Sequence, residues 1–258
     1  MAQDQAPARL PTHPGENAAF TVAITGHRTI AHSHYATLES RISALLDKVR
    51  ARMCASRAET GEPLATLRLI SALAPGADQI AARAALLADG WQLHAFLPFD
   101  LDDYSRIAHA ALHQRMAELA PGTEPLADAE IVAAIHAIAE LTDKAAMVLL
   151  PEDWLPPAQA DDTEATRYAA LGEALVAQAD LLLALWDGQA PRGPGGTGDV
   201  VAMAFAHSVP VIRIDPQPPH TVSGLAPGDM SLDRGIEPAL AAAIGRYATK
   251  GVAEHADS

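Results

Sequence analysis

The stretch ADLLLALWDG, at residues 179–188, leads into a glycine-rich turn, PRGPGGTG, at residues 191–198. The first stretch is apolar nearly throughout rather than alternating, which predicts a β-strand buried on both faces. A helix is predicted directly after the turn, over residues 198–207. A buried strand, a glycine turn and a helix in this order are typical of a parallel sheet with helical crossovers.

Working outward from this stretch, the same alternation recurs along most of the chain. Strands are predicted at 20–25, 67–73, 92–97, 146–150, 180–186 and 210–214. Helices are predicted at 34–53, 76–88, 102–120, 128–141, 163–179 and 198–207, with a final helix at 235–250. We therefore expect an α/β fold of the Rossmann-like, doubly wound type, with a mainly parallel sheet and helices on both faces.

One domain is expected over residues 19–250. Residues 1–18 are rich in proline and polar residues, and residues 251–258 are polar and acidic, so both ends are predicted to be flexible tails. Two further breaks, at 151–162 and 216–233, are rich in proline and are predicted to be surface loops rather than domain boundaries.

Charge and composition narrow the possible partners. The net charge is −14, from 18 Lys and Arg against 32 Asp and Glu, which opposes binding to nucleic acid. No apolar run approaches the roughly 20 residues that span a bilayer, so no membrane partner is expected. The single cysteine, Cys54, excludes an intramolecular disulfide and suits a reducing compartment. We expect a cytoplasmic protein.

Ligands of open parallel sheets bind outside the carboxyl ends of the strands, so the residues that follow each predicted strand are the candidate binding residues. They fall in four segments along the chain. These are Gly26, His27 and Arg28; Gly76, Ala77 and Asp78; Pro98; and Asp187, Gly188, Arg192, Gly195, Gly196 and Thr197.

The last of these segments has the composition of a phosphate-binding turn. Glycines leave the backbone amides open to close approach, and the following helix points its unpaired N–H groups and positive dipole end at the same place. Thr197 is a candidate for capping the helix or for bonding a phosphate oxygen, and Arg192 for a charge-assisted contact. The alternative is a turn that only caps a helix. The spacing matches neither a Walker A motif nor the Gly-x-Gly-x-x-Gly fingerprint.

In the other segments, Arg28 and Asp78 each have two possible roles. Arg28 suits recognition of a phosphate or carboxylate, or it bonds neighbouring loops together with His27. Asp78 either complements the start of a helix or contacts a ribose hydroxyl. The nearby His32 and His34 have no accompanying carboxylate or cysteine pattern of metal-ligand type, so no metal site is expected.

Taken together, TGHR at 25–28, PGAD at 75–78, LPF at 97–99 and the opening stretch through Gly195-Gly196-Thr197 resemble the SLOG superfamily over about residues 20–215. That superfamily includes DprA proteins, LOG phosphoribohydrolases, molybdenum-cofactor carriers and sensors of NAD-derived nucleotides. The resemblance implies a Rossmann-like fold that holds a nucleotide-like phosphate ester over the Gly-Gly-Thr turn, often in a homo-oligomer. The DNA binding of the DprA branch is not expected here, because the chain is acidic and lacks a basic stretch with interleaved aromatics.

The hydrolytic branch of that superfamily has a Pro-Gly-Gly-x-Gly-Thr turn followed by a catalytic Glu. Here Gly198 is followed by Asp199, without a Thr after the glycine and without a nearby Glu. Residues 180–214 are also similar to nucleoside deoxyribosyltransferases, which use a carboxylate nucleophile. Asp187 and Asp199 are therefore the candidate catalytic residues if the protein is an enzyme.

The first hypothesis is a binding or sensing protein for a nucleotide-like ligand, including NAD-derived ones, with no cofactor firmly implied. The second is an enzyme that cleaves or exchanges an N-glycosidic bond. The third is a carrier of a phosphorylated cofactor such as the molybdenum cofactor, and the fourth is a scaffold without a ligand.

Overall fold

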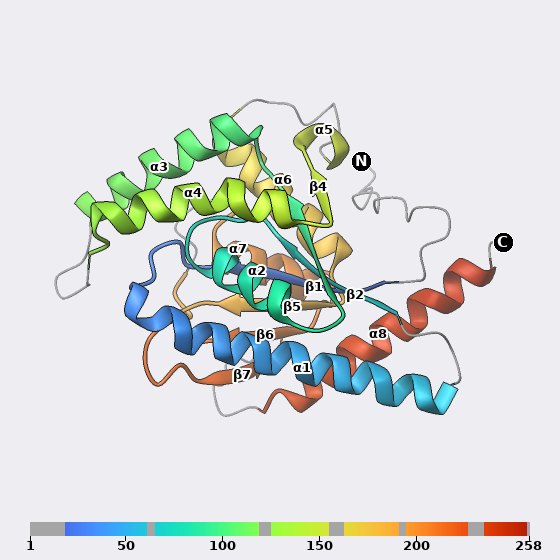
Figure 1. Ribbon diagram of the computed structural model, residues 1–258. Coiled ribbons are helices and arrows are strands. Elements are labelled where there is room, and N and C mark those ends of the chain that lie inside the picture. Colours follow the sequence, from blue (N-terminus) through green and yellow to red (C-terminus); the bar gives the residue numbers. More distant parts are fainter. Residues whose placement is uncertain are drawn as a thin grey trace.

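The computed structural model describes residues 19–60, 65–118, 125–154, 163–190, 195–226 and 235–256. Within them, seven strands form one sheet in the order β4-β3-β2-β1-β5-β6-β7 (Figure 1). The strands are β1 (Ala19–Gly26), β2 (Thr66–Ser71), β3 (Trp91–Phe96), β4 (Met147–Leu149), β5 (Leu181–Leu185), β6 (Val211–Ile214) and β7 (Val222–Leu225). All neighbours pair in parallel except β6 and β7, which are antiparallel. The α/β, Rossmann-like prediction is confirmed.

The longer helices follow the strands in the expected alternation. They are α1 (Tyr35–Thr60), α2 (Ala77–Leu87), α3 (Leu101–Ala117), α4 (Asp128–Lys144), α6 (Glu164–Gln178), α7 (Thr197–Ala206) and α8 (Glu237–Ala256). Two short helices are added, η1 (His32–His34) and α5 (Pro151–Trp154). The last helix continues past Lys250, where the sequence predicted a tail, because residues 251–256 still carry good helix formers such as Ala and Glu.

The prediction of a surface loop over 216–233 is wrong for Val222–Leu225, which form β7 against β6. This strand is short and contains Gly224, so it lacks the apolar run that marks the other strands. Gly224 has a packing reason, because a Cβ there would lie 2.8 Å from the carbonyl oxygen of Gly235, just before α8. Within the other predicted loop, Pro151–Trp154 form α5. Residues 155–162 and 227–233 of these loops lie outside the described residues.

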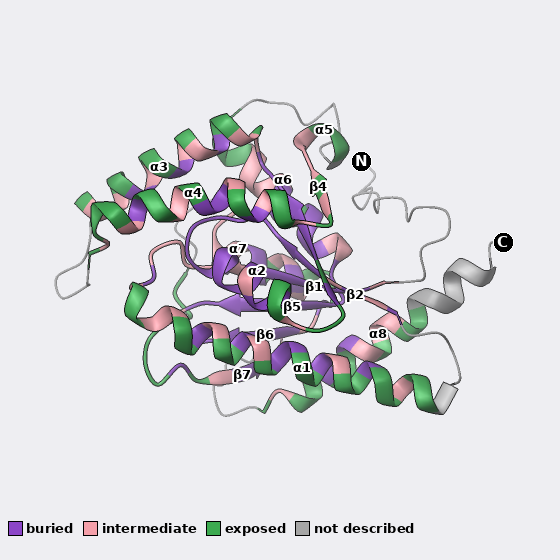
Figure 2. Ribbon diagram, viewed as in Figure 1, coloured by how far each residue is buried: buried purple, intermediate pink, exposed green. Residues whose placement is uncertain are grey.

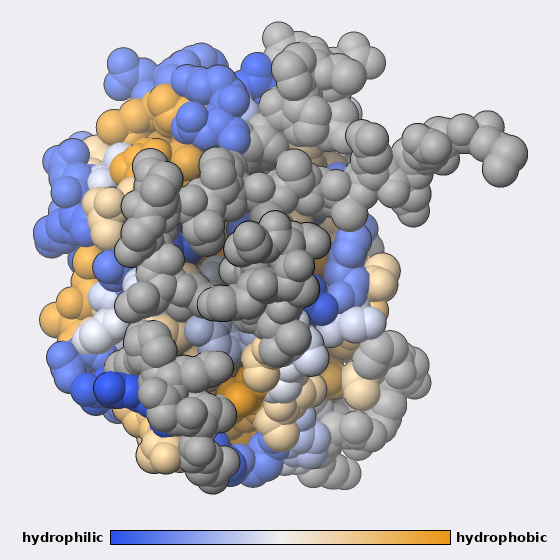
Figure 3. Space-filling view, turned by 90° about the vertical axis from the view of Figure 1, so that its right-hand side faces the viewer, coloured by the Kyte–Doolittle hydropathy of each residue, from blue (hydrophilic) through white to orange (hydrophobic). Residues whose placement is uncertain are grey.

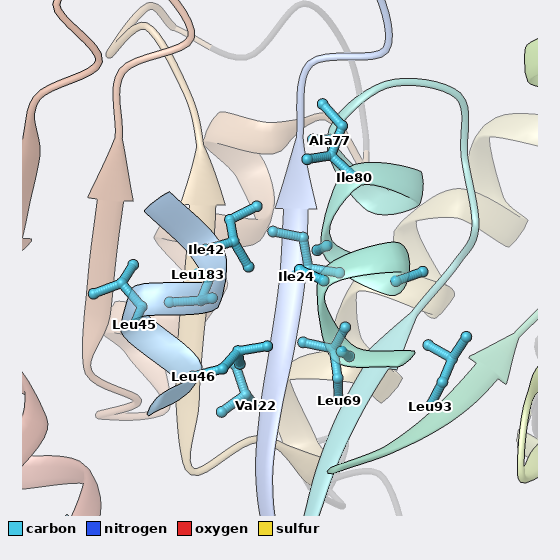
Figure 4. Close-up of a cluster of buried hydrophobic side chains, with 14 of the residues drawn as sticks. Val22, Ile24, Ile42, Leu45, Leu46, Leu69, Ala77, Ile80, Leu93 and Leu183 are labelled. Carbon is cyan, nitrogen blue, oxygen red and sulfur yellow. The ribbon is translucent and has the colours of Figure 1, made fainter. Parts of the chain in front are cut away.

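The core lies on both faces of the sheet, as continuous apolar strands require (Figure 2). On one face α1 and α2 pack over the central strands. Figure 4 shows Ile42 and Leu46 of α1 and Ile80 of α2 beside side chains of β1, β2, β3 and β5. On the other face α6 and α7 cover a second cluster that includes Leu175 and Val201.

Figure 3 shows a mixture of hydrophilic and hydrophobic residues on the face it draws. The large hydrophobic residues that are exposed within the described ranges are Leu86, Leu87, Val132 and Val148. No helix in the described ranges is long and apolar enough to cross a membrane.

The strand order fixes where a ligand site is expected. From β1 the chain proceeds through β2 and β3 to β4 on one side, and it then returns to place β5 on the other side of β1. The order therefore reverses between β1 and β5. In open α/β sheets this topological switch point forms a crevice at the carboxyl ends of the strands, where ligands bind.

Candidate functional site

A pocket of about 270 Å³ lies at this switch point. Its walls come from the ends of β1 and β5, from the first turn of α7 and from the middle of α6. It brings together eight of the residues predicted from the sequence. These are Gly26, His27, Arg28, Asp78, Asp187, Gly195, Gly196 and Thr197.

Two of the predicted glycines, Gly26 and Gly76, are needed for close packing at the start of α2. A Cβ on Gly26 would lie 2.7 Å from the Cβ of Leu185 and would also collide with Ala77. Gly76 has a φ of +85°, and a Cβ there would lie 2.7 Å from the carbonyl oxygen of Arg28. The amide of Ala77 donates to the carbonyl of His27 at 3.0 Å. Gly76 and Ala77 therefore position the loop after β1, and neither lines the pocket.

Arg28 places a permanent cation in the pocket. Its guanidinium carbon lies 4.5 Å from the centre of the Tyr168 ring, which is a cation–π contact. No ion pair of Arg28 is present within the described residues. Burial alone would lower the pKa of Arg28, but the nearby Tyr168, Tyr104 and Asp78 together raise it above its ordinary value. The guanidinium is thus charged and has donors available for a ligand.

Asp78 lies at the bottom of the pocket and is only 5% exposed. Burial raises its pKa from 3.8 to about 7, although Arg28 and the backbone N–H groups of Ala74 and Ala72 oppose the shift. Asp78 is in the first turn of α2, as predicted, so its place near a helix start does not separate the capping role from ligand contact. Its carboxyl group changes charge near neutral pH.

Two tyrosines complete the bottom of the pocket, and the sequence did not single out either of them. Tyr104 comes from the first turn of α3 and is 1% exposed, and Tyr168 comes from α6. Neither hydroxyl has a hydrogen-bond partner within the described residues. Arg28 also interacts with the Tyr168 hydroxyl, but not with ordinary hydrogen-bond geometry. We call Arg28, Asp78, Tyr104 and Tyr168 the floor of the pocket.

One signal in the sequence points to Tyr104. It lies in the helix that follows β3, and such helices begin at the edge of the sheet where ligands bind. Its buried, unpartnered hydroxyl, however, depends on neighbours from other elements, Arg28, Asp78 and Tyr168, which no local pattern reveals.

The amino-terminal end of α7 forms a further part of the lining, next to Tyr168. Gly195 has a φ of +71°, and a Cβ there would lie 2.6 Å from the backbone of Tyr168, so this position requires glycine. Gly196 precedes the first helical residue, and no side chain caps the helix. Thr197 therefore does not cap α7, and Thr197 and Gly198 line the pocket. The first amides of α7, which lack partners within the helix, lie in this part of the lining.

Of the two candidate catalytic carboxylates, only Asp187 lines the pocket. Its Oδ1 accepts a hydrogen bond from the amide of Gln189 at 3.0 Å and lies 3.3 Å from Nε2 of His27. The Asp187 amide lies 3.1 Å from the same Nε2, to which it donates. Asp199 instead accepts a hydrogen bond from the Gly195 amide at 2.9 Å, which holds the glycine turn in place.

The remaining predicted residues lie apart from this set. Pro98 is buried in the connection between β3 and α3 and does not line the pocket. Gly188 has a φ of +85°, which suits glycine in the turn after β5, and it does not line the pocket either. Arg192 lies outside the described residues.

Comparisons with known proteins add little to this geometry. No protein-family model matches the sequence, and no curated protein matches it. Among solved structures, the chain is similar to the X-ray structure of DNA processing protein A (DprA) from Streptococcus pneumoniae. The identity is 16% and the TM-score 0.40, over 78% of this chain and 52% of that chain. The chain thus spans about half the length of that structure, and so distant a match says nothing about ligand or activity.

Proposed function

We propose that the protein binds a small phosphorylated ligand of the nucleotide type in this pocket, as a binding or sensing protein. The observation that carries the proposal is Arg28, a cation that lines the pocket and has no ion pair within the described residues. The amino-terminal end of α7 lines the same pocket and supplies amides of the kind that bind phosphate. Both features favour binding of an anionic ligand.

The rest of the lining supports a ligand with an apolar part as well. Leu171, Leu175 and Val200 form an apolar wall where α6 and α7 meet, which suits the face of a base or sugar. The volume of about 270 Å³ is just below the range of about 300–1,000 Å³ that is usual for ligand pockets. The pocket therefore favours a ligand the size of a mononucleotide over an intact dinucleotide.

Binding without turnover is favoured by the position of Asp199. The hydrolytic SLOG proteins, which this sequence resembles, place a catalytic carboxylate after the glycine turn. Here the carboxylate at that position accepts a hydrogen bond from the Gly195 amide and does not line the pocket. Its oxygen is used to fix the turn, and so it is poorly placed to reach a sugar.

The test is the unfolding temperature of the protein with a panel of nucleoside monophosphates, NAD, ADP-ribose and cyclic nucleotides. A ligand at one hundred times its dissociation constant adds about 2.7 kcal/mol to the free energy of unfolding. For a chain of this size, that raises the unfolding temperature by about 5–11 °C. Each mixture is then sampled for products, and an unchanged ligand supports binding without turnover. A flat panel would contradict the proposal.

A second candidate function is cleavage or exchange of an N-glycosidic bond. It is favoured by Asp187, whose carboxylate lines the pocket beside His27. Asp187→Asn is then expected to abolish base release while leaving ligand binding intact. Asp143→Asn is the matched control, since that carboxylate is exposed on α4 and does not line the pocket. Base release that persists in Asp187→Asn would exclude this mechanism.

A further inference from the structure

Two exposed histidines, His109 and His113, lie one helical turn apart on α3. Their Nε2 atoms are 3.2 Å apart, and their ring centres are 4.4 Å apart with the ring planes at 64°. Neither ring has another hydrogen bond or an ion pair with the described part of the chain. The two Nε2 atoms therefore meet at one place on the surface, and solvent reaches both rings.

The helix explains why the two rings converge. Side chains four residues apart lie on the same face of a helix, with about 5–6 Å between their Cβ atoms. The backbone of α3 thus sets the spacing of the two imidazoles before any ligand is bound. The sequence prediction of no metal site concerned His32 and His34, and the pair on α3 is a different one.

The distance between the two nitrogens fits a shared metal ion. A Zn–N bond is about 2.0–2.1 Å long, so two such bonds at a tetrahedral angle place their nitrogens about 3.3 Å apart, and at a right angle about 2.9 Å. The observed 3.2 Å lies within this range. A hydrogen bond between the rings also fits, but it competes with water at an exposed site and contributes little to stability.

We propose that His109 and His113 chelate a divalent transition-metal ion of the zinc class. Neutral imidazole is a ligand that suits Zn²⁺, Ni²⁺ and Cu²⁺, whereas Mg²⁺ and Ca²⁺ take oxygen ligands. Within the described residues no third His, Cys, Asp or Glu joins the pair. Water therefore occupies the other positions around the ion, and the site is an open one.

The charges around the pair are compatible with a bound cation. Arg106 lies three residues before His109, and its Nη2 donates to Oδ1 of Asp103 at 2.8 Å. Its positive charge is thus offset by a carboxylate of the same helix. The net charge of −14 also favours the approach of a cation to the protein.

This site is independent of the pocket and of the proposed function. Tyr104, which is buried, and Arg115 are the residues of α3 that line the pocket. His109 and His113 lie about 140–180° around the helix from Tyr104, because each residue turns a helix by about 100°. A metal ion on the outer face therefore does not compete with a ligand in the pocket.

The experiment is calorimetric titration of the full chain with Zn²⁺, with Mg²⁺ as the control ion. Because two tethered ligands bind far more tightly than one, His109→Ala and His113→Ala are each expected to weaken Zn²⁺ binding about tenfold or more. The double variant is expected to bind no more weakly than either single variant. His136→Ala is the matched control, since His136 is a single exposed histidine on α4, and it is expected to change nothing.

Amide hydrogen exchange then locates the bound ion. A metal that joins two side chains across one turn opposes local opening of that turn. We expect Zn²⁺ to slow exchange of the α3 amides around residues 109–113 in the wild type and not in His113→Ala. Both histidines are exposed, so their replacement by Ala leaves the fold intact.

Three results would overturn the inference. They are a Zn²⁺ affinity that is equal in the wild type and in His109→Ala or His113→Ala, an equal loss of affinity in His136→Ala, and binding of Mg²⁺ as tight as that of Zn²⁺. Since His113→Ala is expected to bind phosphorylated ligands like the wild type, a failure of the proposed function would leave this site standing.

Discussion

Arg28 and Arg213 both lie near the carboxyl edge of the sheet, but the protein surrounds them differently. Arg213, in β6, is 2% exposed; its Nε donates to the Trp186 carbonyl at 2.7 Å and its Nη2 to Asp215 at 2.8 Å. Arg28 has no ion pair within the described residues and faces the pocket. Arg213 thus donates hydrogen bonds to groups of the protein, whereas the guanidinium of Arg28 is available to a ligand in the pocket.

The presence of bonding partners within the protein separates structural from functional polar residues at this edge of the sheet. A buried cation whose partners belong to the chain stabilises the fold once it is formed, and its loss leaves those partners unpaired. A cation that rests on an aromatic ring, beside unpartnered hydroxyls, contributes little to the fold and has donors to spare. Three predictions test this contrast.

The largest expected effect concerns stability. Arg213→Met is expected to lower the free energy of unfolding by about 3 kcal/mol, because it leaves a partly buried Asp215 and the Trp186 carbonyl without their donor. Arg28→Met is expected to change it by about 1 kcal/mol or less, since the main loss is a cation–π contact. Urea unfolding of both variants measures the difference. Equal destabilisation by the two changes would contradict the claim that Arg213 stabilises the fold and Arg28 does not.

A smaller effect is expected from pH. Asp78 ionises near pH 7, so the floor loses positive charge as the pH rises through 7. If only the form with protonated Asp78 binds an anion, affinity for AMP falls up to about tenfold from pH 6 to pH 8. Asp78→Asn removes this loss, and the variant also corrects for titration of the phosphate itself, whose second pKa is about 6. Wild type and variant with the same pH profile would show that Asp78 does not titrate beside the ligand.

The smallest effect concerns the Tyr104 hydroxyl in the absence of ligand. Because this buried group has no partner in the described structure, Tyr104→Phe is expected to raise the free energy of unfolding by about 1 kcal/mol. Thermal unfolding without ligand checks the sign, and a clear loss of stability would mean that the hydroxyl has a partner in solution.

The sequence predicted the sheet better than it predicted the site. Continuous apolar runs marked β1 to β6, because inner strands of a parallel sheet are buried on both faces; the edge strand β4 is only partly buried. The strand β7 was missed because Val222–Leu225 is short, contains a glycine and lies among prolines. Antiparallel pairing with β6 rather than local pattern makes it a strand.

For the site, the residues after β1 and β5 were found because ligands of open parallel sheets bind outside the carboxyl ends of the strands. Of these residues, Arg28 and Asp187 line the pocket. The sequence did not show which way each side chain points in the folded protein. Asp199 bonds the Gly195 amide, and Tyr104 reaches the pocket from α3, through contacts that form only in the folded protein.

The most direct test of the account is calorimetric titration of the wild type, Arg28→Gln and Arg41→Gln with the phosphorylated ligand that stabilises the protein most. Arg41 is exposed on α1 and does not line the pocket, so it controls for the change in net charge. We predict one site per chain, an affinity at least tenfold lower in Arg28→Gln, and no change in Arg41→Gln, since a hydrogen bond to a charged group contributes about 1.5–3 kcal/mol. Equal affinities of wild type and Arg28→Gln would contradict the central claim that Arg28 binds the anion.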